Sequence, residues 1–286
     1  MAFDLSFLLE SRPSALIMGI VNSTGDSFSE KAAGSAPDSA VERALELLQN
    51  GADILDIGGE STRPGATKIS IEKELDRVIP VLEKIKHFRP DAICSIDTRH
   101  SEVAAAALAA GAEIINDVSM LRESPEIADL VARHDAALIL SHSRGTPENM
   151  MTDEFCTYSG SIAGVVAKEL NNAAESARRS GVKAENILLD PGIGFAKNPG
   201  QCWELLRDLE KIAPLSGMLV GVSRKSFLGE LTGETVPAQR GGATLAVELD
   251  LAERGVGIIR THAVKELHQA LMVMDKLNKI KNLELI

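Results

Sequence analysis

Four times along this 286-residue chain, a helical pattern ends at a glycine and an apolar, strand-like run begins within a few residues. The junctions begin at Gly51, Gly111, Gly181 and Gly255. Glycine is typical at the C-cap of a helix, because it adopts the left-handed backbone conformation at little cost. The repetition indicates a βα unit used several times, and repeated βα units form parallel sheets covered by helices.

Eight apolar segments have the length and flanks of buried parallel strands. They are Leu16–Asn22, Asp53–Gly58, Ala92–Asp97, Glu113–Asp117, Ala137–His142, Ile187–Asp190, Met218–Gly221 and Ile258–His262. Helical spacing of apolar residues is found in Pro37–Asn50, Ile71–Lys86, Ser101–Ala110, Ile127–Arg133, Ile162–Arg179, Gln201–Ile212 and Ala243–Arg254. Eight βα units with right-handed crossovers close most simply into a (β/α)8 TIM barrel. An open doubly wound sheet is the alternative, but no Gly-x-Gly-x-x-Gly follows a predicted strand.

Composition agrees with one α/β domain and excludes several classes of function. No linker or low-complexity stretch interrupts the chain, so we expect a single domain over residues 1–286, with 1–14 as an N-terminal extension. The net charge of −11 argues against general binding to nucleic acid or to an acidic membrane. No apolar run reaches the length of a membrane span, and we expect a soluble, cytoplasmic protein. The cysteines are widely spaced and odd in number, which predicts free thiols rather than a structural zinc site: Cys94, Cys156 and Cys202.

Nearly every predicted strand ends in a polar residue. These residues are Asn22, Asp56, Asp97, Asn116 with Asp117, His142, Asp190, Ser223 with Lys225, and Arg260 with His262. For any one of them a helix cap or a loop hydrogen bond is the simpler explanation. In a barrel, however, all strand ends converge on one face, where they surround a single pocket. The set as a whole therefore predicts a binding site for a polar ligand.

The residue types suggest what that ligand is. Carboxylates at Asp97 and Asp190 and the amide of Asn116 suit a flat, nitrogen-rich heterocycle, which offers N–H and NH2 donors. The stretch after the seventh strand, from Ser223 to Lys225, joins hydroxyls and cations to a helix N-terminus, an arrangement that binds anions. Further cations for this anion site are Arg63, Arg260 and His262, whereas Arg224 is the better candidate for a surface salt bridge. Whether Asn22 and substrate oxygens also hold a magnesium ion is a question that the residues leave open.

Seven sequence motifs resemble those of the dihydropteroate synthase family, in the order and at the intervals of that family. They are Asn22–Ser29, Asp56–Ala66, Ser95–Thr98, Ile115–Val118, Asp190–Phe195, Ser223–Phe227 and Arg260–His262. The resemblance implies that p-aminobenzoate displaces pyrophosphate from (7,8-dihydropterin-6-yl)methyl diphosphate to give dihydropteroate. No residue looks like a covalent nucleophile, so we expect an SN1-like path. The resemblance also implies that sulfonamides compete with aminobenzoate.

The same resemblance assigns a role to each matching residue. Lys225, Asp97, Arg260 and His262 are the implied catalytic residues, and Asn22 is the implied magnesium ligand. The pterin is expected against Asp97, Asn116, Asp190 and Lys225. The diphosphate is expected near Thr62, Arg63, Arg260 and His262. The aminobenzoate is expected near Phe28, Arg63, Pro64, Phe195, Ser223 and Lys225.

Three places depart from the family pattern. Gly25 stands where proline is usual, and Ala263 follows the histidine where aspartate is commoner. Ser141-His-Ser143 replaces Met-His-Met, which makes one wall of the expected pterin pocket hydroxylic. We expect these changes to alter pocket detail and sulfonamide affinity more than the class of reaction.

Two rival functions and one assembly question stay open. A pterin-binding methyltransferase barrel shares the pterin acids but needs no aminobenzoate subsite, and Ser223–Phe227 and Thr62–Pro64 argue against it. A non-catalytic paralogue is opposed by the retained Lys225, Asp97 and Arg63. The segment Val264–Lys279 is amphipathic; it packs on its own barrel or, as the resemblance suggests, helps to form a homodimer.

Overall fold

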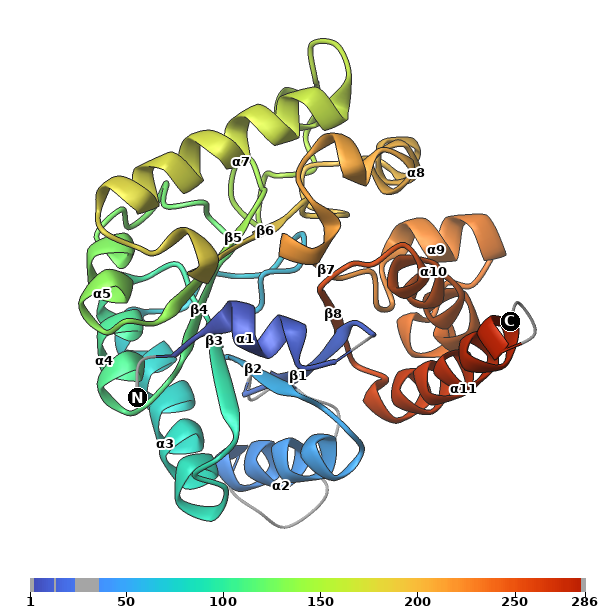
Figure 1. Ribbon diagram of the computed structural model, residues 1–286. Helices are drawn as coiled ribbons and strands as arrows, with labels where there is room; N and C mark the ends of the chain where they lie inside the picture. Colours follow the sequence, from blue (N-terminus) through green and yellow to red (C-terminus); the bar gives the residue numbers. More distant parts are fainter. Residues whose placement is uncertain (1–2, 13, 24–35, 284–286) are drawn as a thin grey trace.

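The computed structural model describes residues 3–12, 14–23 and 36–283, and eight parallel strands form the centre of the fold (Figure 1). The strands are β1 (Leu16–Asn22), β2 (Ile54–Gly58), β3 (Ile93–Asp97), β4 (Ile114–Asp117), β5 (Ala137–Ser141), β6 (Ile187–Asp190), β7 (Leu219–Val220) and β8 (Ile258–Thr261). Their hydrogen-bonding order is β6-β5-β4-β3-β2-β1-β8-β7, and a parallel bridge between Leu189 and Met218 joins the two ends. The sheet therefore closes on itself, which confirms the predicted (β/α)8 barrel.

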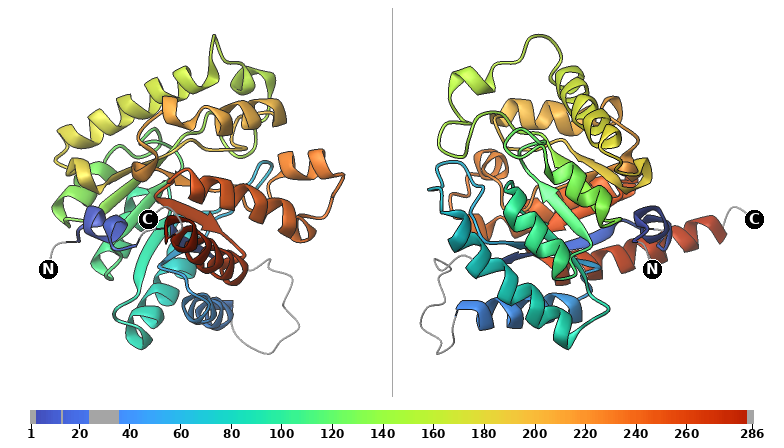
Figure 2. Two further views of the ribbon diagram at one scale, coloured as in Figure 1. Left: turned by 45° about the vertical axis from the view of Figure 1, so that its right-hand side comes forward. Right: turned by 90° about the vertical axis from the view of Figure 1, so that its left-hand side faces the viewer.

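Helices form the outer layer around the strands (Figure 2). They are α1 (Leu5–Glu10), α2 (Ala36–Gln49), α3 (Ile71–Phe88), α4 (Ser101–Ala109), α5 (Ile127–Arg133), α6 (Asp153–Cys156), α7 (Ile162–Arg179), α8 (Pro199–Arg207), α9 (Ser226–Thr232), α10 (Gly241–Glu253) and α11 (Val264–Leu283). The sequence patterns miss α1 and α6, which have 6 and 4 residues and are too short to show a helical period. Helix α9 begins at Ser226, directly after Lys225, where the sequence predicts a helix N-terminus. Among the described residues, no helix combines the length and the apolar character needed to cross a bilayer.

The helix expected over Gln201–Ile212 is two elements in the structure. Helix α8 begins earlier, because Asn198 and Gln201 form a capping box around Pro199. It ends where Asp208 leaves helical geometry (φ −106°), and a short 3-10 turn, Leu209–Lys211, follows. The Asp208 carboxylate forms ion pairs with Arg207 at 2.8 Å and with Lys211 at 3.1 Å.

The four junction glycines have the conformation that the sequence predicts. Their φ angles are +101° at Gly51, +97° at Gly111, +100° at Gly181 and +89° at Gly255. At Gly51 the space is restricted as well, since a Cβ atom there would lie 2.5 Å from the ring of His268 on α11. Each glycine thus ends its helix and turns the chain into the next strand.

The barrel interior is apolar at the amino ends of the strands. Side chains alternate along a strand, so every second residue points inward. The buried interior cluster consists of Leu5, Leu16, Met18, Ile54, Ile114, Ala137, Ile139, Leu188, Leu219 and Ile258. Burying a side chain of this kind stabilises the fold by about 1.5–3 kcal/mol.

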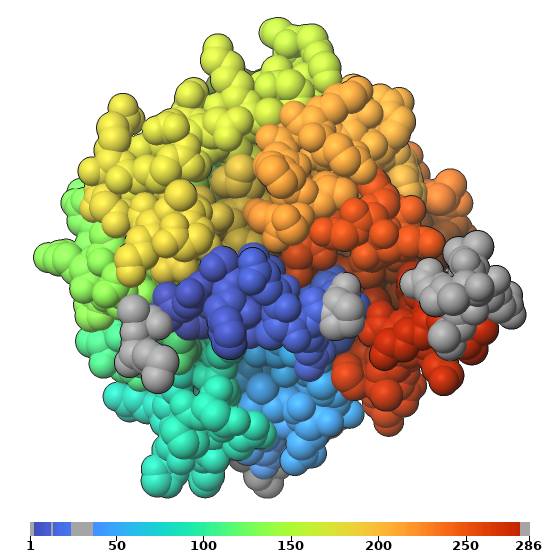
Figure 3. All heavy atoms as spheres, viewed as in Figure 1, coloured from blue at the N-terminus to red at the C-terminus, as the bar shows by residue number. Residues whose placement is uncertain are grey.

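Helix α1 covers this end of the barrel, at the centre of the face seen in Figure 3. It contributes Leu5, which is fully buried, and the Leu5 backbone N–H donates to the Asn186 side-chain oxygen at 3.2 Å. The helix lies inside the predicted extension 1–14, whose boundary stays a prediction. Because α1 closes the amino end, a ligand reaches the interior from the carboxyl ends of the strands, which is the usual site face of this fold.

Candidate active site

A layer of polar side chains lies directly above the apolar interior. Strand alternation produces it: two residues after inward-facing Ile54, Ile114 and Leu188 come Asp56, Asn116 and Asp190. The members of this polar layer are Asp56, Ser95, Asp97, Asn116, Ser141, Asp190 and Arg260. All except Arg260 are at most 6% exposed. Buried polar groups need partners, so the contacts of this layer decide what it can bind.

Arg260 on β8 pairs with two carboxylates from the neighbouring part of the barrel. Its Nε lies 2.6 Å from Asp56 Oδ2, and its Nη2 lies 3.0 Å from Asp97 Oδ2. Burial raises the pKa of Asp97, and Arg260 opposes that rise. Among the described residues, Asp56 Oδ1, Asp97 Oδ1 and the Ser95 hydroxyl have no hydrogen-bond partner. Buried acceptors without donors are what a donor-rich ligand satisfies.

A second chain of hydrogen bonds continues across the barrel. Asn116 donates through Nδ2 to Asp56 Oδ2 at 3.3 Å. The Ser141 hydroxyl lies 3.2 Å from both Asn116 Oδ1 and Asp190 Oδ2. The other oxygen of Asp190 accepts the Gly192 backbone N–H at 2.8 Å. Since a hydroxyl carries one hydrogen, Ser141 satisfies only one of its two acceptors at a time, and the other is free to accept from a ligand.

Lys225 brings a partly buried cation to the edge of this layer. It caps the start of α9, and its ammonium donates to the Ile193 carbonyl. The Lys225 nitrogen lies 4.7 Å from the centre of the Phe195 ring, within the range of a cation–π contact. Burial lowers the pKa of Lys225 to about 8, and Asp190 opposes that effect. The structure therefore brings Asp190 and Lys225, predicted from the strand ends, together with Phe195, which the family resemblance implies.

A positive region surrounds His262 at the end of β8. The Ser223 hydroxyl lies 3.0 Å from His262 Nδ1 and accepts the His262 backbone N–H at 3.2 Å. Burial lowers the pKa of His262 to about 3, and nearby arginines lower it further: Arg224, Arg260, Arg63 and Arg43. His262 is therefore neutral at physiological pH. The arginines around it make this region positive, and a local positive region is what an acidic chain needs in order to bind an anion.

Arg43 is a member of this region that the sequence patterns miss. Its Nη2 donates to the His262 carbonyl at 3.0 Å, across 219 positions of sequence. Arg43 lies on α2, on a helix face rather than at a strand end, so no motif identifies it. Arg224 was expected in a surface salt bridge, but it forms none among the residues described, and its positive charge helps to lower the pKa of His262.

Comparison with known proteins identifies the family to which this chain belongs. The sequence model of the pterin-binding enzymes matches residues 18–262. A dihydropteroate synthase from Synechocystis is 40% identical over 262 residues, which are 91% of this chain and 89% of that protein. The chain belongs to the dihydropteroate synthase family of pterin-binding enzymes.

Solved structures agree with the family. A Xanthomonas albilineans dihydropteroate synthase with 4-aminobenzoic acid has 38% identity and a TM-score of 0.85, over 93% of this chain and 94% of that one. A Burkholderia cenocepacia enzyme complexed with 7,8-dihydropteroate has 38% identity and a TM-score of 0.83, over 94% and 93% of the two chains. The chain also matches 31% of a longer, probable bifunctional folate protein of Halobacterium salinarum. The protein is thus a transferase of folate biosynthesis, as the motifs predict.

The remaining predicted site residues lie on the loops around the polar layer. Thr62 faces a small recess that Phe195 also lines, and Arg63 and Pro64 are exposed. The Gly65 backbone N–H donates to the Pro147 carbonyl at 2.7 Å, which joins the loops after β2 and β5. Asn22 is the exposed last residue of β1. Phe28 lies outside the described residues. The roles of all these residues stay predictions.

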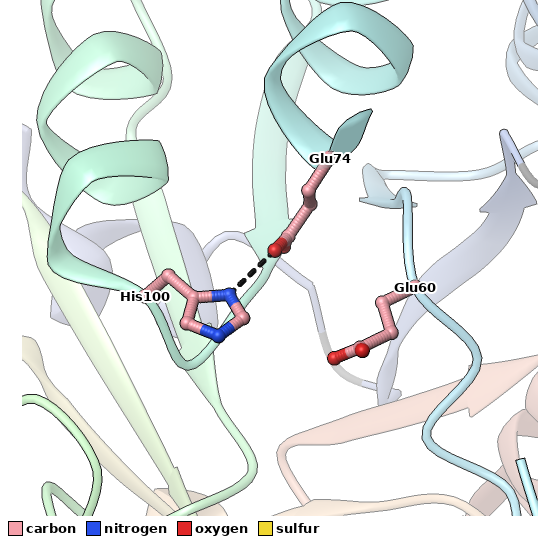
Figure 4. A group of neighbouring side chains, drawn as sticks. All are labelled: Glu60, Glu74 and His100. Carbon is pink, nitrogen blue, oxygen red and sulfur yellow. Dashed lines mark hydrogen bonds and ion pairs between the residues drawn. The ribbon is translucent and has the colours of Figure 1, made fainter. Parts of the chain in front are cut away.

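Three buried side chains near the site, Glu60, Glu74 and His100, point toward one another (Figure 4). His100 Nδ1 lies 2.6 Å from Glu74 Oε2, and that contact raises the pKa of His100. Glu60 is already paired on both oxygens, with Arg99 at 2.7 Å and with the Ile69 backbone N–H at 2.9 Å. The cluster is therefore an internal ion-pair group that joins the loop after β2 to the starts of α3 and α4.

Proposed function

We propose that the polar layer binds the pterin ring of (7,8-dihydropterin-6-yl)methyl diphosphate, with Asp97, Asn116 and Asp190 accepting its N–H and NH2 groups. The observation that carries this proposal is the buried Asp97 Oδ1, which has no donor among the described residues. A carboxylate in this position gains a charge-assisted hydrogen bond from a ring donor. Lys225, beside Asp190, supplies the complementary donor for a ring nitrogen or oxygen.

The diphosphate lies, in this proposal, at the positive region around His262. Thr62 and Arg63 approach it from the loop after β2, and Arg260 approaches it from the barrel interior. Arg260 holds two carboxylates on one side, so its charge is fixed in orientation before substrate binds. A preorganised cation of this kind stabilises the charge that develops on departing pyrophosphate.

The aminobenzoate occupies the outer part of the pocket. Phe195 and Pro64 offer apolar surface to its ring, while Arg63, Ser223 and Lys225 offer donors to its carboxylate. Support comes from the 4-aminobenzoic acid named in the Xanthomonas albilineans structure. A sulfonamide complex of the related Yersinia pestis enzyme supports sulfonamides as competitors for this subsite. We propose that Phe28 also contacts the aminobenzoate ring.

Magnesium fits the oxygen chemistry at the end of β1. Asn22 offers an exposed amide oxygen there, and magnesium prefers oxygen ligands, retaining waters and substrate phosphates in its remaining positions. When bound by Asn22 and the diphosphate, the ion supplies positive charge to the leaving group.

The described residues support an SN1-like course. The bond between the pterin methylene carbon and the diphosphate oxygen breaks first, and its electron pair leaves with pyrophosphate. Arg260 and Arg63 stabilise that anion, while the electron-rich pterin, held by Asp97 and Asp190, delocalises the methylene cation. The aniline nitrogen then forms the C–N bond and loses one proton. Loop closure excludes the water that would otherwise capture the cation.

A product assay tests the function itself. Purified protein is mixed with the pterin diphosphate, p-aminobenzoate and Mg²⁺, and dihydropteroate is sought by mass. Formation of product that depends on both substrates is the expected result. Absence of product, together with failure to complement a synthase-deficient strain, would support a non-catalytic paralogue instead.

We also propose that the protein is cytoplasmic and forms a homodimer. Helix α11 exposes a row of apolar side chains toward its described end, each more than 40% exposed: Met272, Val273, Leu277 and Ile280. An exposed apolar row of this kind is typical of a subunit interface. Light scattering of the wild type and of a Val273→Glu, Leu277→Glu variant tests it, with a dimer and a monomer expected. A monomeric wild type would contradict the dimer.

A further inference from the structure

Lys197 is among the largest fully buried side chains of the described residues, and the reaction scheme does not use it. It is 1% exposed. Its ammonium nitrogen lies 2.9 Å from His142 Nδ1 and 2.9 Å from the Phe195 carbonyl oxygen. Removing an ammonium group from water costs several kcal/mol unless hydrogen bonds replace the lost hydration. A lysine buried in this way is costly for the fold, and its partners indicate what it stabilises.

His142 connects Lys197 to a second pair of charges. His142 Nε2 lies 2.9 Å from Glu169 Oε2 on α7, and Glu169 in turn is bound by Arg144. Burial, with Lys197 as the second cause, lowers the pKa of His142 to about 3, so the ring is neutral. Because Lys197 donates a hydrogen bond, His142 Nδ1 is the acceptor. His142 Nε2 must then carry the ring hydrogen, which it donates to Glu169. Lys197, His142, Glu169 and Arg144 thus alternate donors and acceptors in one row, of which Lys197 and His142 are buried.

Lys197 lies near the end of the loop from Asp190 to Asn198, which links β6 to α8. The loop takes positive φ angles at Gly192 (+64°), Gly194 (+82°) and Ala196 (+51°). A Cβ atom on Gly192 would lie 1.8 Å from the His142 carbonyl oxygen. Glycine adopts this conformation at little cost, but alanine does not, so the strained backbone at Ala196 persists only where its surroundings hold it.

Two hydrogen bonds hold the strained part of the loop. Lys197 binds the Phe195 carbonyl, and the Tyr158 hydroxyl donates to the Ala196 carbonyl at 3.0 Å. Tyr158 belongs to the same group, since the Arg144 guanidinium lies 4.2 Å above its ring. The loop then presents the Ile193 carbonyl and the Phe195 ring to Lys225.

We propose that Lys197 is a positioning residue: by binding the Phe195 carbonyl and His142, it fixes the part of the loop that places the Phe195 ring for aminobenzoate. This inference rests on the proposed aminobenzoate subsite. Lys197 is 1% exposed, so it acts through Phe195 rather than by touching substrate. Asp190 precedes the strained residues and is held separately by Ser141 and Gly192, so the pterin subsite depends less on Lys197.

Lys197→Met tests the proposal, because methionine fills nearly the same volume but donates no hydrogen bond. We expect the KM for aminobenzoate to rise about tenfold. The dissociation constant of the pterin diphosphate, measured by the fluorescence of the pterin without turnover, is expected to change less than twofold. Lys168→Met, an exposed lysine on α7, is the matched control and should leave both values unchanged.

If Lys197 only stabilises the fold, the result is different: the aminobenzoate KM and the pterin dissociation constant both rise, by the same factor, as the folded fraction of the protein falls. That pattern, or an unchanged KM for aminobenzoate in folded Lys197→Met, would overturn the proposal. If Lys197→Met does not fold, Tyr158→Phe decides, since it removes only the bond to the Ala196 carbonyl. A selective rise of about threefold in the aminobenzoate KM supports the proposal, and an unchanged KM overturns it. Wild-type enzyme that forms no dihydropteroate in the same assay would refute the function and not the loop mechanism.

Discussion

Replacing Asp97 by asparagine removes a charge from the centre of the proposed pterin site while keeping the shape of the side chain. In the structure, Asp97 Oδ2 accepts from Arg260 at 3.0 Å and Oδ1 has no partner among the described residues. In Asp97→Asn, Arg260 is a donor and therefore selects the amide oxygen as its partner. The amide NH2 group must then point where Oδ1 was, toward the donors of the pterin ring.

The expected effect follows from that reversal. A hydrogen bond to a charged group contributes about 1.5–3 kcal/mol, and a buried donor left facing another donor costs about 1–3 kcal/mol more. A total of about 3–4 kcal/mol corresponds to a fall of roughly 100-fold to 1,000-fold in kcat/KM. Folding should be little affected, because Arg260 retains Asp56 at 2.6 Å.

Pyrophosphate release measures turnover, and pterin fluorescence measures binding of the diphosphate substrate in the same samples. The matched control is Asp250→Asn on α10, where the side chain is exposed and lies 3.4 Å from Arg254. We expect the control to stay within twofold of wild type. A folded Asp97→Asn variant with kcat/KM within threefold of wild type would refute the assignment of Asp97 to the pterin.

Three further changes have distinct expected results. Lys225→Ala should lower the rate of pyrophosphate release by roughly 100-fold or more, because a preorganised cation is lost, and a near-normal rate would contradict that role. Asn22→Ala should raise the Mg²⁺ concentration for half-maximal activity by about tenfold, and an unchanged requirement would remove Asn22 from the metal site. Burial raises the pKa of Glu248 to about 8, so the folded state binds a proton that the unfolded state releases above about pH 4.5. The stability of the wild type should therefore fall between about pH 4.5 and 8, and Glu248→Gln should flatten that fall in thermal melts. An equal pH dependence of the melting temperature in both proteins would exclude Glu248 as the cause.

The strand order and the convergence of polar residues were predictable, because both follow from local pattern. Strand alternation puts Ile54 and Asp56 on one side of the sheet, and a closed parallel barrel brings Asp56 to the same face as Asp97 and Arg260. These rules use only the position of a residue within its own strand. They gave the fold class and most members of the polar layer.

The partners of each side chain were not predictable in the same way. Arg260 reaches Asp56 across 204 positions of sequence, and a guanidinium at that place has several carboxylates within its reach. The contacts of Arg43 and Lys197 are harder still to predict, since Arg43 lies on a helix face and Lys197 is buried within a loop. Their contacts depend on side-chain rotamers and on a left-handed loop backbone, and neither leaves a periodic signal in the sequence.

The same contacts explain why burying these charged side chains lowers the folding stability of the ligand-free enzyme. Asp56, Asp97 and Asp190 bring three carboxylates into the interior, whereas Arg260 and Lys225 bring two cations. The apolar layer below offsets that cost, because its ten buried residues and α1 close the opposite end of the barrel. A ligand that donates hydrogen bonds to the unpartnered oxygens removes part of the cost, so binding and folding are linked. At 100 times its dissociation constant, such a ligand stabilises the folded state by about 2.7 kcal/mol. A pterin should therefore raise the melting temperature of the wild type, and Asp97→Asn should lose most of that rise.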